Sequence, residues 1–349
     1  MRKYKLALIG FGNVGRGFAQ ILRDRGDKIA GDFGVGAILV AVSDIRLGCL
    51  YNPDGISPAA LLDAVEKTGS LECVLAPKKG WDALRTIRET NADVIVEVAW
   101  TDLKTGEPAI GHIRAALEAG KHAITTNKGP AALAYRELAA LAAEKGVVFG
   151  VEGTVMSGTP SLRLATELLA AAGIRKVQGI LNGTTNFILT QMHAGSDYQS
   201  ALKEAQTLGY AEADPAGDVE GIDAAGKLII LAHVLMKESI SLKDVELEGI
   251  TRLTPEDIQQ AQKAGECWKL IASLERKDFG LAASVAPRRI PLSHPLASVG
   301  GATNAITYTT DLLGDVTLIG PGAGQLETGY AILSDLLAID RQCGKKPLA

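Results

Sequence analysis

YKLALIGFGNVGRGFAQILRDRG, the stretch from Tyr4 to Gly26, decides the fold of the N-terminal region. A short apolar strand runs into three glycines in GxGxxG spacing, and a helix follows them. In this arrangement the first glycine allows a tight turn, the second lets a pyrophosphate approach the backbone, and the third permits close packing of helix on strand. The pattern predicts a dinucleotide site at the helix N-terminus, formed by Gly10, Phe11, Gly12, Asn13, Val14 and Gly15.

The second predicted strand, over residues 36–44, ends in an acidic residue. Asp44 stands where a carboxylate would bind a ribose 2′-hydroxyl, although it comes later than the usual spacing of about 20 residues. We attribute the delay to an inserted polar loop over residues 24–34. Arg46 stands at the same turn, where an arginine would accept a 2′-phosphate instead, so the sequence leaves both NAD and NADP open.

Strands and helices then alternate as far as residue 155, which predicts an α/β fold with a Rossmann-type, doubly wound parallel sheet. The TTNK motif ends one of these strands, at the carboxyl edge where open α/β sheets bind ligands. Thr126, Asn127 and Lys128 are therefore further cofactor candidates, although a single lysine is more often an exposed turn residue. The predicted elements are strands over 92–99, 121–129 and 147–155, and helices over 110–120 and 130–146.

A second, α+β region follows, with its own small sheet. Its predicted strands cover residues 177–181, 283–285, 305–310 and 315–319, and helices fill most of the interval to residue 274, including one over 264–274. The sequence then ends in a strand, a turn containing Gly320, Gly322 and Gly324, and a helix over residues 326–339. We expect this C-terminal segment to return to the first domain and place Gly322 and Gly324 beside the dinucleotide; a turn without a ligand is the alternative.

The stretch from Leu208 to Leu231 contains five acidic residues within a dozen positions, followed by one lysine in a long apolar run. Residues 222–236 read as a helix that is apolar on nearly every side, as a buried helix is. Asp223 and Lys227 are four residues apart and share a face of it. An unpaired buried ammonium is costly, so Lys227 is expected to pair with Asp223 or to face a polar cavity. A purely structural ion pair remains the alternative.

Composition excludes several classes of function. The 349 residues carry a net charge of -4, which gives no basic surface for nucleic acid or an anionic membrane, and no segment reads as a signal peptide or membrane span. The four cysteines are scattered without metal-ligand spacing, which predicts a reduced, cytoplasmic protein without a structural zinc site. The length favours two domains.

Together these motifs resemble those of homoserine dehydrogenases. The resemblance rests on GFGNVG at residues 10–15, TTNKGP at 125–130, GILNGTTNFILT at 179–190 and LGYAEADPAGDVEGIDAAGKLIILA at 208–232, with HPLASVGGATNAI and GPGAG near the C-terminus. It covers nearly the whole chain in the right order. It implies a short form without a C-terminal regulatory domain, and hence without inhibition by threonine through such a domain.

The resemblance also assigns roles to residues. It implies Lys227 and Asp223 as the catalytic pair, with Lys128 as a second active-site lysine. It implies a substrate site formed by Glu212, Asp218, Asn182, Gly183 and Thr184. It further implies a monovalent cation, Na⁺ or K⁺, held mainly by backbone carbonyls at Glu152, Val155, Ser157 and Thr159. There the chain reads EGTVMSGTP where the family commonly shows EATVGAGLP or EATVGGGIP.

By the same resemblance the chain is a homodimer. The dinucleotide-binding domain covers residues 1–150 and 318–349, the dimerisation region covers 151–160 and 295–317, and the catalytic domain covers 161–294.

The implied reaction is reversible, NAD(P)-dependent interconversion of L-aspartate 4-semialdehyde and L-homoserine, a step toward threonine, methionine and isoleucine. Lys227 would stabilise or protonate the carbonyl oxygen during hydride transfer. One alternative is a non-catalytic dinucleotide sensor, which would not need the acidic cluster and its lysine. The other is a different amino-acid semialdehyde dehydrogenase, of which a phosphorylating type needs a cysteine nucleophile. The one tempting thiol, Cys267, reads as a packing residue on an amphipathic helix.

Overall fold

The computed structural model describes residues 1–102 and 104–344, which form two compact units. The first unit contains residues 1–158 and the C-terminal segment from Gly324, and the second contains residues 159–323. Residues 345–349 of the predicted dinucleotide-binding segment lie outside the described residues. No helix among the described residues is both long and apolar enough to cross a membrane.

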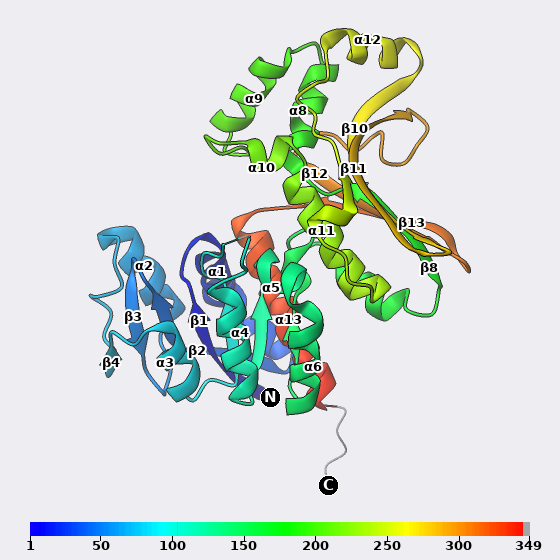
Figure 1. The fold of residues 1–349 in the computed structure, drawn as a ribbon. Coiled ribbons are helices and arrows are strands. Elements are labelled where there is room, and N and C mark those ends of the chain that lie inside the picture. Colours follow the sequence, from blue (N-terminus) through cyan, green and yellow to red (C-terminus); the bar gives the residue numbers. More distant parts are fainter. Residues whose placement is uncertain (103, 345–349) are drawn as a thin grey trace. The chain divides into compact units, whose positions relative to one another are not determined.

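The first unit is built on a seven-stranded sheet in the order β4-β3-β2-β1-β5-β6-β7 (Figure 1). The five strands from β2 to β7 in this order are parallel, which confirms the predicted Rossmann-type sheet. The edge pair β3 and β4 runs antiparallel. The strands are β1 (Arg2–Ile9), β2 (Val35–Asp44), β3 (Gly48–Tyr51), β4 (Lys78–Lys79), β5 (Val94–Glu97), β6 (His122–Thr125) and β7 (Phe149–Gly150).

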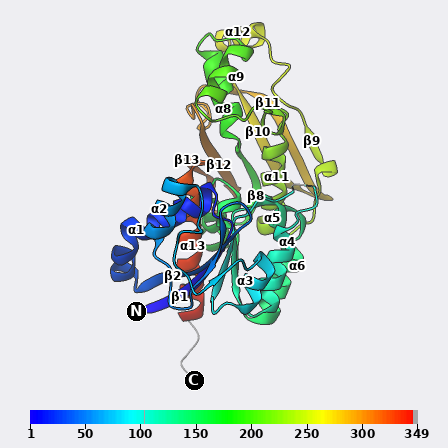
Figure 2. The same ribbon diagram turned by 90° about the vertical axis from the view of Figure 1, so that its left-hand side faces the viewer.

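Helices cover both faces of this sheet (Figure 2). On one face lie α1 (Asn13–Phe33), α2 (Pro58–Thr68) and α13 (Gln325–Gly344), and on the other lie α3 (Ala83–Glu89), α4 (Ala109–Glu118) and α6 (Tyr135–Lys145). The short helix α5 (Lys128–Leu133) follows β6.

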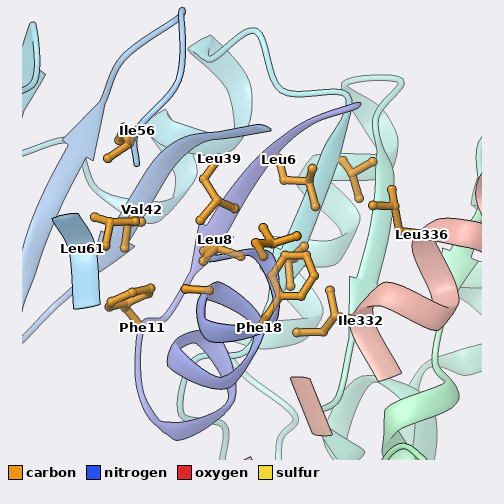
Figure 3. Close-up of a cluster of buried hydrophobic side chains, with 14 of the residues drawn as sticks. Leu6, Leu8, Phe11, Phe18, Leu39, Val42, Ile56, Leu61, Ile332 and Leu336 are labelled. Atoms are coloured by element: carbon orange, nitrogen blue, oxygen red, sulfur yellow. The ribbon is translucent and has the colours of Figure 1, made fainter. Parts of the chain in front are cut away.

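The C-terminal helix α13 completes the core of the first unit, as the sequence predicted. Ile332 and Leu336 of α13 pack with Leu6 of β1 and Phe18 of α1 in one buried cluster (Figure 3). Full burial of such a side chain stabilises the fold by about 1.5–3 kcal/mol. The helix that follows the last glycine-rich turn is therefore a structural part of the dinucleotide unit.

The polar loop predicted over residues 24–34 is wrong, because α1 continues through this segment to Phe33. The polar side chains here are exposed and pair along the helix, as Lys28 does with Asp32 at 2.9 Å, so polarity marks a solvent-facing stretch of helix. The late position of Asp44 thus follows from a long α1. The strand predicted over 147–155 shrinks to the two residues of β7, and a 3-10 turn (Glu152–Thr154) follows it.

The second unit contains a six-stranded sheet in the order β13-β12-β8-β10-β11-β9. Helices α8 and α11 pack against it (Figure 1). The strands are β8 (Ile174–Ile180), β9 (Val245–Leu247), β10 (Glu266–Lys277), β11 (Gly280–Pro291), β12 (Thr303–Thr310) and β13 (Gly314–Pro321). The helices are α7 (Ser161–Arg163), α8 (Gly183–His193), α9 (Tyr198–Thr207), α10 (Ala216–Val219), α11 (Ile222–Leu231) and α12 (Pro255–Lys263); π-helical turns cover Leu164–Leu168 and Ala232–Met236, and a 3-10 turn covers Leu242–Asp244.

Two expectations for this unit need correction. The helix predicted over residues 264–274 is strand β10, which pairs antiparallel with β11 along its whole length. Its central residues 269–272 are all buried, so this part of the sequence lacks the alternation that distinguishes a strand, and pairing outweighs local preference. Residues 318–323, assigned to the dinucleotide-binding domain, belong to the second unit because β13 pairs with β12 as far as Pro321. Residues 303–310 and 314–317 of the predicted dimerisation region lie in strands β12 and β13 of this sheet, and the role of that region in a dimer stays a prediction.

Candidate active site

The glycine-rich turn between β1 and α1 is shaped by close backbone approaches. Gly10 has φ +97°, and a Cβ there would lie 2.7 Å from the backbone of Val98 and Ala99. A Cβ at Gly15 would lie 2.8 Å from the carbonyl oxygen of Gly10, whereas one at Gly12 would meet nothing within 4 Å. Gly12 is also the N-cap of α1 and provides no side-chain cap. Open space therefore lies over a helix N-terminus, the feature that a pyrophosphate requires.

Asp44 ends β2 and ties this turn to the next one. Its Oδ2 accepts a hydrogen bond of 2.8 Å from the N–H of Phe11, and its Oδ1 accepts 2.9 Å bonds from the N–H groups of Arg46 and Leu47. The carboxylate therefore fixes the backbone, and its remaining lone pairs are what a ribose would use. The side chain of Arg46 is exposed, as is that of Asn13 on α1.

The TTNK motif joins β6 to α5, where Asn127 is the N-cap and Lys128 is the first helical residue. The amide of Asn127 donates to a carboxylate oxygen of Glu97, at the end of β5, and to the carbonyl oxygen of Ala99 at 2.8 Å. Thr126, Asn127 and Lys128 are all half-buried. The motif thus lies at the carboxyl edge of the parallel sheet, as predicted.

In the second unit, the turn from β8 into α8 organises the acidic cluster. Asn182 caps α8 through its Oδ1, which accepts the N–H of Thr185 at 2.9 Å. Its Nδ2 donates to Asp218 at 2.7 Å and to Asp223 at 2.9 Å. One buried amide therefore holds two carboxylates at the start of α8. Gly183 follows, and a Cβ there would lie 2.5 Å from the carbonyl oxygen of Ala302.

Lys227 forms the predicted ion pair with Asp223 on α11. Its Nζ lies 2.9 Å from Asp223 Oδ2 and also donates a hydrogen bond to the carbonyl oxygen of Leu181. The lysine is only 8% exposed. A buried ammonium is thereby fixed in direction by two acceptors from two elements, one on α11 and one beside the cap of α8.

The remaining residues assigned to substrate differ in exposure. Asp218, at the end of α10, is partly buried, and burial raises the pKa of its carboxyl while the hydrogen bond from Asn182 opposes that shift. Thr184 is buried and its hydroxyl donates to the carbonyl oxygen of Tyr210 at 2.6 Å. Glu212 is exposed in the loop between α9 and α10. The structure thus groups Asn182, Asp218, Asp223 and Lys227, and places Glu212 on the loop beside Tyr210.

The second glycine-rich turn is divided between the units. Gly322 belongs to the second unit, and a Cβ there would overlap the side-chain amide of Asn304 on β12. That amide is completely buried, and neither of its polar atoms has a hydrogen-bond partner among the described residues. Gly324 belongs to the first unit, where a Cβ would overlap the carboxylate of Glu327. Packing against the buried Asn304 therefore requires glycine at 322, and a φ of +138° favours glycine at 324, while their predicted cofactor contacts stay predictions.

The residues assigned to a cation follow β7. Glu152 and Val155 are buried, and Met156 and Ser157 both adopt positive φ, at 59° and 55°. Two successive left-handed residues are uncommon without glycine and redirect the carbonyls of this segment. Such a backbone fits carbonyl ligation of a hard monovalent ion. Thr159 begins the second unit, where its hydroxyl donates to the carbonyl oxygen of Pro321 at 2.9 Å.

Sequence reasoning missed the residues that support these groups. Glu97 lies inside the strand predicted over residues 92–99, where one carboxylate in an otherwise apolar segment indicates buried partners. No sequence pattern indicates the roles of the Leu181 carbonyl and the Asn304 amide, because these roles depend on contacts between segments far apart in the sequence.

Comparison with known proteins agrees with this arrangement. A family model described as homoserine dehydrogenase, NAD binding domain, matches residues 10–152, and one described as homoserine dehydrogenase matches residues 160–337. The first match lies within the first unit, and the second covers nearly the whole second unit and continues into α13 of the first unit.

Full-length relatives carry the same description. The chain is 44% identical over 349 residues to the NAD(+)-dependent homoserine dehydrogenase of Pseudomonas canavaninivorans, with 99% of both chains covered. It is 42% identical over 337 residues to the homoserine dehydrogenase of Methanocaldococcus jannaschii, with 96% of this chain and 98% of the relative covered. A solved hyperthermophilic archaeal homoserine dehydrogenase in complex with NADPH is similar with a TM-score of 0.84 at 29% identity, and 98% of each chain is covered. The chain belongs to the homoserine dehydrogenase family.

Proposed function

We propose that this chain catalyses the reversible, NAD(P)-dependent reduction of L-aspartate 4-semialdehyde to L-homoserine, a step in amino-acid biosynthesis. The observation that carries this proposal is the buried ammonium of Lys227, held by Asp223 and the carbonyl of Leu181. Reduction of an aldehyde develops negative charge on the carbonyl oxygen, and a fixed ammonium in a dry environment stabilises that charge. It can also donate the proton that completes the alcohol.

The other polar groups suit an amino-acid substrate. The carboxylates of Glu212 and Asp218 are complementary to its α-ammonium, and Lys128 to its carboxylate or aldehyde. The amide of Asn182 donates to Asp218 and Asp223, so the role proposed for Asn182 in the substrate site is to position these two carboxylates. The backbone of Gly183 and Thr184 at the start of α8 is available to the substrate.

The first unit has the features that a nicotinamide dinucleotide needs. The open space at Gly12 and the uncapped start of α1 fit a pyrophosphate, and when bound the cofactor supplies the hydride chemistry. Asp44 favours a ribose 2′-hydroxyl and thus NAD, whereas the exposed Arg46 favours a 2′-phosphate and thus NADP. One relative is named NAD(+)-dependent and another was solved with NADPH, so similarity supports either cofactor.

Three further properties belong to the same proposal. The left-handed backbone at Met156 and Ser157 supports a Na⁺ or K⁺ site at Glu152, Val155 and Ser157, with Thr159 adjacent in sequence. We also propose a homodimer that uses residues 151–160 and 295–317, and a cytoplasmic location that suits four free cysteines.

The phosphorylating semialdehyde dehydrogenase fits the structure less well. Cys267 lies buried on β10, and burial raises the pKa of its thiol, whereas a nucleophilic cysteine needs a lowered pKa. Its nearest polar contact is the carbonyl oxygen of Ala297 at 3.9 Å, which is not a base.

Initial rates with homoserine and either NAD or NADP test the proposal. We expect reduction of at least one cofactor, dependent on homoserine and reversed by aspartate 4-semialdehyde. Dialysis against buffer free of Na⁺ and K⁺, followed by addition of each, tests the cation. Cofactor binding without any turnover would instead support the dinucleotide sensor and contradict the proposed activity.

A further inference from the structure

Glu97 is a completely buried carboxylate at the carboxyl end of β5, next to β1 in the parallel sheet. Two groups donate hydrogen bonds to its carboxylate: the N–H of Ala99 at 3.2 Å and the side-chain amide of Asn127; the hydroxyl of Thr125 donates instead to the backbone carbonyl oxygen of Glu97 at 3.0 Å. These donors come from the loops that follow two neighbouring strands. One carboxylate therefore joins the ends of β5 and β6 at the edge where this fold binds ligands.

A carboxylate is the side chain that this position requires. The two donors use different oxygens, Oε1 for Ala99 and Oε2 for Asn127, whereas an amide of the same size has only one accepting oxygen. The nearest cationic candidate is His112 on α4, whose Nδ1 lies 3.5 Å from Glu97 Oε1 and forms no hydrogen bond among the described residues. Neutral donors thus provide the hydrogen bonds that offset burial of this group.

Each of the two joined loops leads to the proposed cofactor site. The backbone of Val98 and Ala99 lies against Gly10, where it leaves no room for a Cβ. Asn127 caps α5, which begins with Lys128. We infer that Glu97 is a positioning residue for the dinucleotide: through Ala99 it fixes the wall of the glycine turn, and through Asn127 it fixes the start of α5. This inference rests on the proposed cofactor site of the first unit.

Glu97→Gln tests this role with little change in volume. The NH₂ group of the introduced glutamine would face a hydrogen-bond donor, and that donor would lose its acceptor. We expect KM for the cofactor to rise and kcat to fall, each about tenfold, as for loss of one or two buried hydrogen bonds. KM for homoserine is expected to change less than KM for the cofactor, because the acidic cluster lies in the other unit and only Lys128 depends on the start of α5. A purely structural role would lower Tm without this split between the two KM values.

A reciprocal exchange sharpens the test. Asn127→Asp alone places a second carboxylate against Glu97 and should weaken cofactor binding more than Glu97→Gln does. In the double variant, the amide introduced at position 97 would donate to the carboxylate introduced at position 127, so we expect partial recovery of cofactor affinity relative to Asn127→Asp. Asp93→Asn is the matched control, since Asp93 is exposed, precedes the same strand, and accepts the N–H of Lys5 at 2.7 Å. It should leave cofactor KM unchanged.

Direct titration of cofactor binding separates this inference from the proposed activity. If the wild type binds cofactor but does not oxidise homoserine, the activity fails while Glu97 is still tested by affinity. Unchanged cofactor affinity in Glu97→Gln, or strictly additive losses in the double variant, would overturn the inference. If Glu97→Gln does not fold, Asn127→Ala removes one donor to the carboxylate, and an unchanged cofactor KM in that variant would overturn it as well.

Discussion

Lys227 Nζ lies 2.9 Å from Asp223 Oδ2 on the same face of α11, and both side chains are at least four-fifths buried. The carbonyl of Leu181 and the amide of Asn182 complete the contacts of this pair on the adjacent turn. The pair thus has partners for both charges within the second unit. An ammonium with a fixed direction and little solvent is the group that the proposed reaction needs.

Replacement of the ammonium is the first prediction. Lys227→Ala and Lys227→Met should lower kcat by about 10²–10³ or more, the effect of removing a group that stabilises the developing charge. Cofactor affinity, measured by direct titration, should stay near the wild-type value because the glycine turn is in the first unit. Near-normal turnover by either folded variant would contradict the assigned role.

Variants of the Lys227–Asp223 pair should affect stability and activity differently. Either Lys227→Met or Asp223→Asn leaves one buried group without its partner and should destabilise the second unit by about 3–5 kcal/mol. The double variant should recover much of that loss, as measured by denaturant unfolding, while remaining inactive. If the loss of stability in the double variant equals the sum of the losses in the two single variants, the two side chains do not interact.

The start of α8 tolerates no side chain at Gly183. A Cβ would lie 2.5 Å from the carbonyl oxygen of Ala302, so Gly183→Ala must displace either the helix or the loop that precedes β12. We expect homoserine KM to rise at least tenfold with unchanged cofactor affinity. Gly217→Ala on α10 is the control, because a Cβ there meets nothing within 4 Å and alanine favours a helix. A Gly183→Ala variant with wild-type KM would remove this turn from the substrate site.

Two histidines, one in each unit, should make the protein less stable at acidic pH. His122 Nδ1 accepts the N–H of Val148 at 3.0 Å, His193 Nε2 accepts that of Trp268 at 2.9 Å, and burial lowers both pKa values. The unfolded chain then binds more protons, so stability falls as the pH drops through about 6.5, the ordinary value for histidine, and below. Tm measured from pH 8 to pH 5 should show this loss. His122→Gln and His193→Gln should each flatten the curve, and curves as steep as wild type would exclude these groups.

Asp218 should act in the opposite direction. Burial raises the pKa of its carboxyl, so the folded chain binds more protons and stability falls as the pH rises from about 4 through the raised value. Asp218→Asn should gain Tm relative to wild type as pH increases over this range, while losing homoserine affinity. The exposed Asp214 provides the control variant, Asp214→Asn. A Tm difference independent of pH would contradict this account.

The sequence predicted the features that depend on neighbours along the chain. The glycine turn before α1, the register of Asp223 with Lys227 and the return of α13 all follow from local spacing or apolar period. It failed at β10, which is a strand because β11 pairs with it, and at residues 24–33, where polar side chains on the exposed side of α1 suggested a loop. The hydrogen bonds that Asn182 donates to two carboxylates, and the position of Glu97, depend on packing between elements. A local sequence pattern does not indicate such contacts.

The division of the dinucleotide unit into two segments has a consequence during synthesis on the ribosome. Leu6 and Phe18 emerge early, but Ile332 and Leu336, which pack with them, emerge only after the whole of residues 159–323. The second unit is continuous and can fold as soon as it is complete, whereas the apolar face that α13 covers stays uncovered until α13 itself has been synthesised. Nascent chains halted before α13 should therefore need chaperones at their N-terminal part.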